Sequence, residues 1–164
     1  MATYHVIGVG QHGKYFDENS YHDVTSYIFN PRSAVYVGGT GITSTTTAAE
    51  EMRQTAIHFG KDKGKRLRHS TLSFDNTEHV SPEAANEYAQ KIIQFYAPEY
   101  QIAYSVHDST DNVHIHFVMN QISYIDGHRY QGKKKDYYDF QHHMRTVTHL
   151  PILLVKDRNQ ASED

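Results

Sequence analysis

The sequence predicts an α+β protein whose central sheet is mostly antiparallel, has five strands and is flanked by helices. Strand-like stretches with alternating side chains are interleaved with amphipathic helical stretches along the chain. Two successive turn signals, one polar and one containing Asp126 and Gly127, favour antiparallel pairing of neighbouring strands. The length of 164 residues fits a single domain. We expect residues 1–155 to form that domain and residues 156–164 to be a flexible tail that begins a linker to a further C-terminal region.

The first half of the chain predicts two strands and two helices. Residues 2–9 are rich in β-branched and aromatic side chains, as strands are, and residues 33–37 have a similar composition. Residues 17–31 place apolar side chains on one helical face and end at a proline, which cannot continue a helix. Residues 45–60 also have one apolar face and end at a glycine, a common residue at helix C-termini.

The second half predicts three more strands and two more helices. Residues 66–74 read as a strand whose side chains alternate between two faces, with Leu67, His69, Thr71 and Ser73 on one and Arg68, Ser70, Leu72 and Phe74 on the other. Ser81 is a good helix cap, and Pro82 suits the first helical position. The remaining elements are strands at 100–107 and 113–123 and helices at 81–100 and 135–150.

The composition excludes several classes of protein. The chain has no cysteine, so disulfides and thiolate metal sites are absent. Its apolar runs are too short to cross a bilayer, and its first residues lack the features of a signal peptide, so we expect a cytoplasmic protein without a membrane partner. The net charge of −3 argues against a broadly basic nucleic-acid binder, although residues 61–68 and 129–135 are two local basic strips.

Three histidines lie within ten positions, at His107, His114 and His116. Residues two apart on a strand point to the same face, so His114 and His116 project together. A hairpin across residues 108–112 places the end of one strand beside the start of the next, which brings His107 to the other two. Three imidazoles with an open fourth side are typical of a catalytic metal site. The alternative is a polar strand face with hydrogen-bonded histidines, because a His-x-His pair alone is weak evidence in a chain with 13 histidines.

The stretch "SVHDSTDNVHIHFVMNQIS" resembles the third motif of conjugative relaxases. These are MobA/VirD2-like mobilisation nucleases of the histidine-hydrophobic-histidine (HUH) endonuclease superfamily. "SYIFNP" is similar to the first motif, a tyrosine on an early helix, and "RHSTLSF" to the second, a strand ending in Ser-Phe. The resemblance spans residues 20 to 140 in the family's order. It implies a palm-like or ferredoxin-like sheet.

The resemblance also implies a reaction. A relaxase nicks one strand of single-stranded DNA at the origin of transfer, site-specifically, by attack of a tyrosine hydroxyl on the scissile phosphate. The products are a free 3'-hydroxyl and a 5'-phosphotyrosine link. Tyr27 matches the family's nucleophile, with Tyr21 in reserve. A divalent metal held by the three histidines would assist as a Lewis acid. The ion is expected to be Mn²⁺ or Mg²⁺, with Zn²⁺, Ni²⁺ or Co²⁺ as alternatives, although imidazole suits magnesium least.

Other residues receive supporting roles by resemblance and by chemistry. The turn departs from the family pattern, and either Asp108 or Asp111 could orient a ligand imidazole or help deprotonate the tyrosine. His69 shares a strand face with Ser73, so it either points to the same cleft or bonds locally. The candidates for DNA contact are Ser73, Arg32, Arg129, Lys133, Lys134 and Lys135.

Three other functions stay open at this stage. A replication initiator or transposase of the same superfamily would use the same tyrosine and metal. A three-histidine metallohydrolase of a small molecule would use metal-bound water instead. A sheet-based nucleic-acid binder would use neither. For a relaxase, the resemblance implies two protein partners, an accessory relaxosome protein and a type IV coupling protein, in the cytoplasm of a bacterium that carries a plasmid or transposon.

Overall fold

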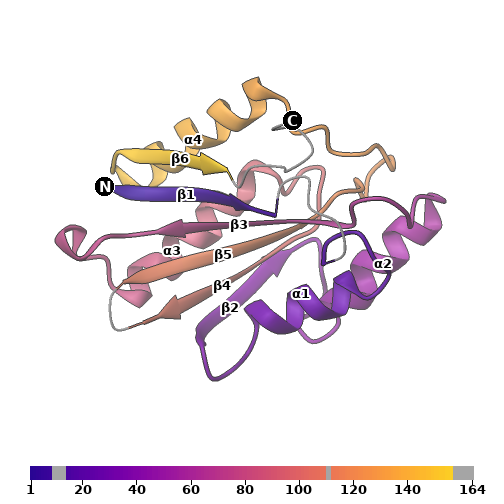
Figure 1. Cartoon of the computed structure of the whole chain (residues 1–164), viewed down its shortest axis with the longest axis horizontal. Coiled ribbons are helices and arrows are strands. Elements are labelled where there is room, and N and C mark those ends of the chain that lie inside the picture. The colour runs from indigo at the N-terminus through magenta and orange to yellow at the C-terminus, as the bar shows by residue number, and fades with distance from the viewer. Residues whose placement is uncertain (9–13, 110–111, 157–164) are drawn as a thin grey trace, which may run out of the picture.

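A mixed six-stranded sheet forms the centre of the computed structural model, which describes residues 1–8, 14–109 and 112–156 (Figure 1). The strand order is β2-β4-β5-β3-β1-β6. Every neighbouring pair is antiparallel except β1 and β6, which are parallel. The strands are β1 (Ala2–Ile7), β2 (Ala34–Thr40), β3 (Leu67–Ser73), β4 (Ile102–Asp108), β5 (Val113–Asn120) and β6 (Ile152–Lys156).

The predicted fold class is confirmed, and the sheet has one more strand than the five expected. The additional strand, β6, comes from the short apolar run that follows Pro151. Lys156, which was assigned to the tail, ends this strand, and residues 157–164 lie outside the described residues. The expected hairpin around Gly127 is a turn closed by a single antiparallel bridge between Ile122 and Arg129.

Helices cover the two faces of the sheet in pairs. Helices α1 and α2 lie on one face, and α3 and α4 lie on the other (Figure 1). Two short 3₁₀ turns, η1 and η2, flank α3. The bounds are α1 (Ser20–Ile28), α2 (Ala48–His58), η1 (Asn76–Glu78), α3 (Pro82–Ile92), η2 (Ile93–Phe95) and α4 (Lys134–Thr148). None of the described helices is long and apolar enough to cross a membrane.

Helix ends follow the signals in the sequence. The Ser81 hydroxyl accepts a hydrogen bond from the Ala84 amide at 3.0 Å, which is the predicted cap of α3. Gly60 follows α2 with φ +67°, a left-handed conformation that glycine adopts without strain. Helix α1 ends at Ile28, before Pro31, and this early end leaves the Ile28 carbonyl free to accept a bond from outside the helix.

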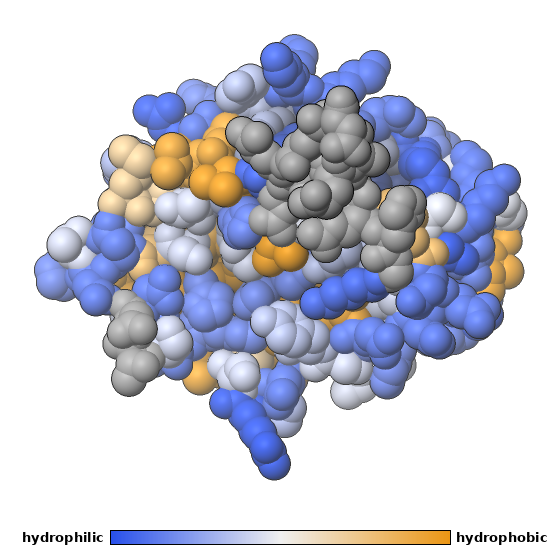
Figure 2. All heavy atoms as spheres, in the orientation of Figure 1, coloured by the Kyte–Doolittle hydropathy of each residue, from blue (hydrophilic) through white to orange (hydrophobic). Residues whose placement is uncertain are grey.

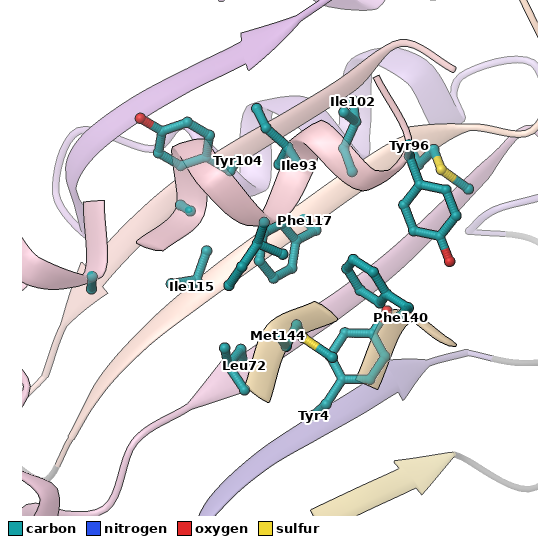
Figure 3. Packing of buried hydrophobic residues seen from close by; sticks show 14 of the residues in the cluster. Tyr4, Leu72, Ile93, Tyr96, Ile102, Tyr104, Ile115, Phe117, Phe140 and Met144 are labelled. Carbon is teal, nitrogen blue, oxygen red and sulfur yellow. The ribbon is translucent and has the colours of Figure 1, made fainter. Parts of the chain in front are cut away.

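The larger hydrophobic core fills the space between the sheet and helices α3 and α4 (Figure 3). Phe140 of α4 lies at its centre, with ring centroids 5.3 Å from Tyr4 and 4.8 Å from Tyr96. Met144 and Phe117 pack in the same cluster. Burial of this aromatic surface is the main force that holds α3 and α4 to the sheet.

The core beneath α1 and α2 is smaller. Val24 and Ile28 of α1 and Met52 of α2 pack on Ala103 and Val118 of the sheet. The face drawn toward the viewer in Figure 2 is mostly hydrophilic, with separate small hydrophobic areas. Helix α1 lies over only part of the sheet (Figure 1), and His107 of β4 contacts the carbonyl of its last residue, Ile28.

Candidate active site

The three histidines of the third motif converge on one face of the sheet, as the strand pattern predicted. His107 on β4 and His114 on β5 are direct cross-strand partners. Their ring centroids are 5.2 Å apart, and those of His107 and His116 are 4.3 Å apart. One nitrogen of each imidazole lies within 4.8 Å of the other two. The side chains therefore offer three convergent nitrogen ligands, a donor set that suits a divalent transition metal.

Hydrogen bonds fix which nitrogen one of these rings can offer. The His107 Nε2 lies 2.9 Å from the carbonyl oxygen of Ile28. A carbonyl can only accept, so this nitrogen carries the hydrogen and the Nδ1 lone pair of His107 is left for a metal. The His116 Nδ1 lies 2.8 Å from the Nε2 of His69, which leaves its own Nε2 on the other side of the ring.

The environment keeps two of the histidines neutral. Burial, with added repulsion from neighbouring cationic groups, lowers the pKa of His116 to about 2. Burial also lowers the pKa of His114, with a smaller effect of His107. Metal binding needs the neutral imidazole, so these two side chains are ready to bind an ion at neutral pH.

Tyr27 lies beside the histidines and is open to solvent. Its ring packs edge-on to His116, with centroids 5.7 Å apart, and its side chain is 52% exposed. Tyr21 is buried, and its hydroxyl donates to an Asp62 carboxylate oxygen at 3.0 Å. Burial and the Asp62 charge raise the pKa of Tyr21 above its ordinary value. Of the two tyrosines, Tyr27 alone combines exposure with contact to the triad.

A protein-family model described as "Relaxase: MobA/VirD2-like, nuclease domain" matches residues 27–149. The chain belongs to this relaxase family. Two curated relatives, both called Protein rlx and both from Staphylococcus aureus, are 31% identical over 94 residues and 30% identical over 88 residues. These matches cover 57% and 54% of this chain but 28% and 27% of the relatives, so the matched part spans just over a quarter of each relative's length. No solved structure matches the chain.

Ser73 and Arg32 lie near the histidine triad formed by His107, His114 and His116. Ser73 on β3 is the direct cross-strand partner of His114. Arg32 is exposed and lies two residues before Ala34, whose cross-strand partner is His107. Both positions are therefore at the same end of the sheet as the three histidines.

The structure does not bring Asp108 to the triad. This residue follows His107 on β4, so its side chain points to the opposite face of the sheet. There it lines a hollow together with Phe74 and Val80, which belong to the face covered by α3 and α4. Asp111 lies outside the described residues.

The other predicted DNA contacts lie at the far end of the sheet. Arg129 follows the carboxyl end of β5, and its guanidinium donates to the backbone carbonyls of Lys63 and Lys65, each at 2.8 Å. It therefore fastens the segment that leads into β3. The three lysines of the basic run are exposed at the start of α4, and one of them, Lys135, pairs with Asp139. The structure does not bring Arg129, Lys133, Lys134 or Lys135 to the histidine triad.

Lys14 and Tyr15 were not predicted to take part in the site. The Lys14 ammonium lies 5.0 Å from the centre of the Tyr27 ring. The Tyr15 hydroxyl lies 2.9 Å from the Nδ1 of His69, and His69 in turn contacts His116. Lys14 and Tyr15 lie in a loop without a periodic pattern, so no local signal in the sequence could assign them to a relaxase site.

Proposed function

We propose that this domain is a DNA relaxase that nicks single-stranded DNA at an origin of transfer, with Tyr27 as the nucleophile. The observation that carries the proposal is the exposed Tyr27 ring, which packs against one histidine of a convergent triad. Membership of the relaxase family supports the class of reaction. The two relatives called Protein rlx support the same class.

The triad fits a divalent ion in number and kind of ligand. His107, His114 and His116 would hold it, with His107 binding through Nδ1 and His116 through Nε2. When bound, such an ion supplies Lewis acidity to a non-bridging oxygen of the scissile phosphate. We propose Mn²⁺ or Mg²⁺, and imidazole ligands favour the former.

The chemical step is a transesterification, in which the scissile phosphorus exchanges its bond to the 3'-oxygen for a bond to the Tyr27 oxygen. The Tyr27 hydroxyl loses its proton to solvent, and the phenolate oxygen forms a bond to the scissile phosphorus. The bond from that phosphorus to the 3'-oxygen breaks, and the 3'-oxygen leaves with the electron pair and takes up a proton from solvent, so that no net proton is released or consumed. The DNA 5' end is then linked to Tyr27 as a phosphodiester, so the step is reversible and the strand can be rejoined.

Three further side chains are suited to hold the strand at this point. The Lys14 ammonium beside the Tyr27 ring can attract a phosphate next to the attacking oxygen. The Ser73 hydroxyl, on the strand beside His114, can donate to a phosphate oxygen. Arg32, at the same end of the sheet, can contact the neighbouring backbone phosphates.

A covalent-adduct assay tests the proposal. The protein is incubated with Mn²⁺ and single-stranded DNA that spans a candidate origin of transfer and is labelled at its 3' end, the end that stays with the 5'-phosphotyrosine fragment, and the products are separated on a denaturing gel. We expect a labelled protein band with the wild type and none with Tyr27→Phe. Tyr138→Phe is a matched control, because that tyrosine is 55% exposed and lies on α4, on the other face of the sheet.

The same gel can contradict the proposal. An adduct of normal yield with Tyr27→Phe would exclude Tyr27 as the nucleophile. Release of nicked DNA without any adduct would favour attack by water and a metallohydrolase. An adduct formed on a replication-origin hairpin but not on origin-of-transfer DNA would favour a replication initiator over a relaxase.

The proposal also extends to the setting in which the domain works. A relaxase in a bacterial cytoplasm would require an accessory protein that exposes the origin and a type IV coupling protein that delivers the complex. We propose both as partners, and co-purification with the products of neighbouring mobilisation genes would test them.

A further inference from the structure

A chain of buried hydrogen bonds leads from the metal triad into the protein interior. The His116 Nδ1 lies 2.8 Å from the His69 Nε2, and the His69 Nδ1 lies 2.9 Å from the Tyr15 hydroxyl. His69 is 2% exposed, and Tyr15 is 1% exposed. The three groups come from the loop before α1, from β3 and from β5, so the fold alone brings them together.

Only two arrangements of the ring hydrogens satisfy both bonds when the two histidines are neutral. In the first, His116 Nδ1–H donates to His69 Nε2, and His69 Nδ1–H donates to the Tyr15 oxygen. In the second, the Tyr15 hydroxyl donates to His69 Nδ1, and His69 Nε2–H donates to His116 Nδ1. The His116 Nε2 carries a lone pair in the first arrangement and a hydrogen in the second. Only the first arrangement can bind a metal.

We propose that His69 is a positioning residue that holds His116 in its metal-binding tautomer, with Tyr15 as the acceptor that completes the chain. This inference rests on the metal site of the proposed function. It adds the buried groups that orient one of the three ligands of that site. Imidazole and phenol here do the work that a carboxylate often does beside a metal-bound histidine. Asp108, the acid next to His107 in sequence, lies on the other face of the sheet and cannot take that part.

The location of His69 separates this role from direct contact with DNA. Its burial excludes the substrate, whereas Tyr27, whose ring centroid is 6.0 Å from that of His69, is exposed. Both nitrogens of His69 are in hydrogen bonds within the protein. The side chain can therefore act on the site through the ring orientation and the tautomer of His116.

Calorimetric titration with Mn²⁺ tests the inference without any DNA. We expect His69→Leu to weaken metal binding about 10- to 100-fold, as loss of a partner behind a metal ligand does. His69→Gln should restore most of the affinity, because its side-chain oxygen can accept from His116 while its amide donates to Tyr15. Tyr15→Phe should have a smaller effect than His69→Leu. His142→Leu, an exposed histidine on α4, is the matched control and should bind as the wild type does.

The outcomes distinguish this inference from the metal site itself. Absence of Mn²⁺ binding in the wild type would overturn both. Normal affinity in a folded His69→Leu variant would overturn the role of His69 and leave the triad intact. If His69→Leu does not fold, a nitrogen-15 NMR spectrum of the wild type with Zn²⁺ decides instead. We expect hydrogens on the Nδ1 of both His116 and His69, and a hydrogen on His69 Nε2 would overturn the inference.

Discussion

Arg68 and His69 are consecutive residues of β3, and their side chains enter opposite faces of the sheet. Both are buried, with 7% and 2% exposure, and both contact tyrosines. The Arg68 guanidinium lies 5.0 Å from the centre of the Tyr130 ring, on the face covered by α3 and α4. His69 bonds to Tyr15 on the face covered by α1 and α2.

The polar cluster around Arg68 and the polar cluster around His69 differ in how far helices cover them. On the Arg68 face, the hydroxyls of Tyr96 and Tyr130 both donate to Asp136 of α4, so the polar groups fasten a helix over a large core. On the His69 face, the bonds lead outward to His116 and the exposed Tyr27. Buried polar groups thus stabilise packing where helices cover the sheet completely, and they support a binding site where the cover ends.

Phe140→Ala should have the largest effect on stability. The side chain is in the centre of the larger core, so its loss should lower the free energy of unfolding by about 3 to 5 kcal/mol. Urea denaturation measures this change. Metal affinity of the folded fraction should be unaffected, and a parallel loss of Mn²⁺ binding would show that the two faces are coupled.

His116→Ala should have the opposite signature. Loss of a group that only orients a metal ligand is expected to reduce Mn²⁺ affinity about 10- to 100-fold. Loss of one of the three proposed ligands should reduce it by more. The change in unfolding free energy should be smaller than that of Phe140→Ala. Calorimetry with His142→Ala as control measures the affinity, and retention of wild-type affinity would exclude His116 as a ligand.

Acidification should destabilise the metal-free protein through the histidine face. Burial, with smaller effects of neighbouring cations, lowers the pKa of His69 to about 3, and that of His116 is lowered to about 2. Below about pH 6.5 the unfolded chain therefore binds protons that the folded chain does not, and stability falls as pH falls, by up to about 1.4 kcal/mol per pH unit for each histidine.

The His69→Leu variant provides the comparison for this pH effect. The free energy of unfolding is measured by urea denaturation between about pH 6.5 and about pH 5, with a chelator present. Its slope against pH should be shallower in the variant, because one histidine fewer contributes to it. Equal slopes in variant and wild type would mean that His69 takes up a proton in the folded state. Arg68 stays charged throughout this range, so its side chain should contribute nothing to the slope.

Lys14→Gln should have a moderate effect on DNA binding. One fewer phosphate contact should lower the slope of log affinity against log salt concentration by about 0.7 for a single strand. Fluorescence anisotropy with a labelled oligonucleotide measures this slope. Lys91→Gln on α3 is the matched control, since that exposed lysine lies on the other face. A slope that does not differ from the control would remove Lys14 from the DNA path.

Asp108→Asn should have the smallest effect. Because its exposed side chain faces away from the histidines, stability should stay within about 0.5 kcal/mol of the wild type. Mn²⁺ affinity should also be unchanged. A tenfold loss of affinity would place this carboxylate with the triad after all.

The sequence contains enough local information to place the triad. Alternation along β5 aims His114 and His116 together, and the hairpin brings in His107, so the geometry follows from the order of residues. The same alternation could have shown that Asp108, one residue after His107, faces away. Position on the strand therefore decides against Asp108, although an acid next to a ligand has suitable chemistry for the site.

Long-range contacts account for what the sequence could not show. Strand β6 is a five-residue apolar run, and it pairs with β1 from the other end of the described chain. Local patterns do not identify such a partner. The hydrogen-bonded groups behind the triad are also distant in sequence. Tyr15 and His69 are 54 residues apart, and His69 and His116 are 47 residues apart. The basic run at Lys133 to Lys135 is visible in the sequence, but only the fold shows that it lies far from the histidines.

Two consecutive residues of α1 join the two halves of the candidate site. Tyr27 carries the hydroxyl, and the next residue, Ile28, supplies the carbonyl that orients His107. A shift of α1 by one residue would turn its side chains by about 100° around the helix axis and would remove both contacts together. The proposed nucleophile and the proposed metal ligand therefore depend on the same register of α1. An insertion or deletion within α1 before Tyr27 should abolish both functions at once, even though neither side chain is altered.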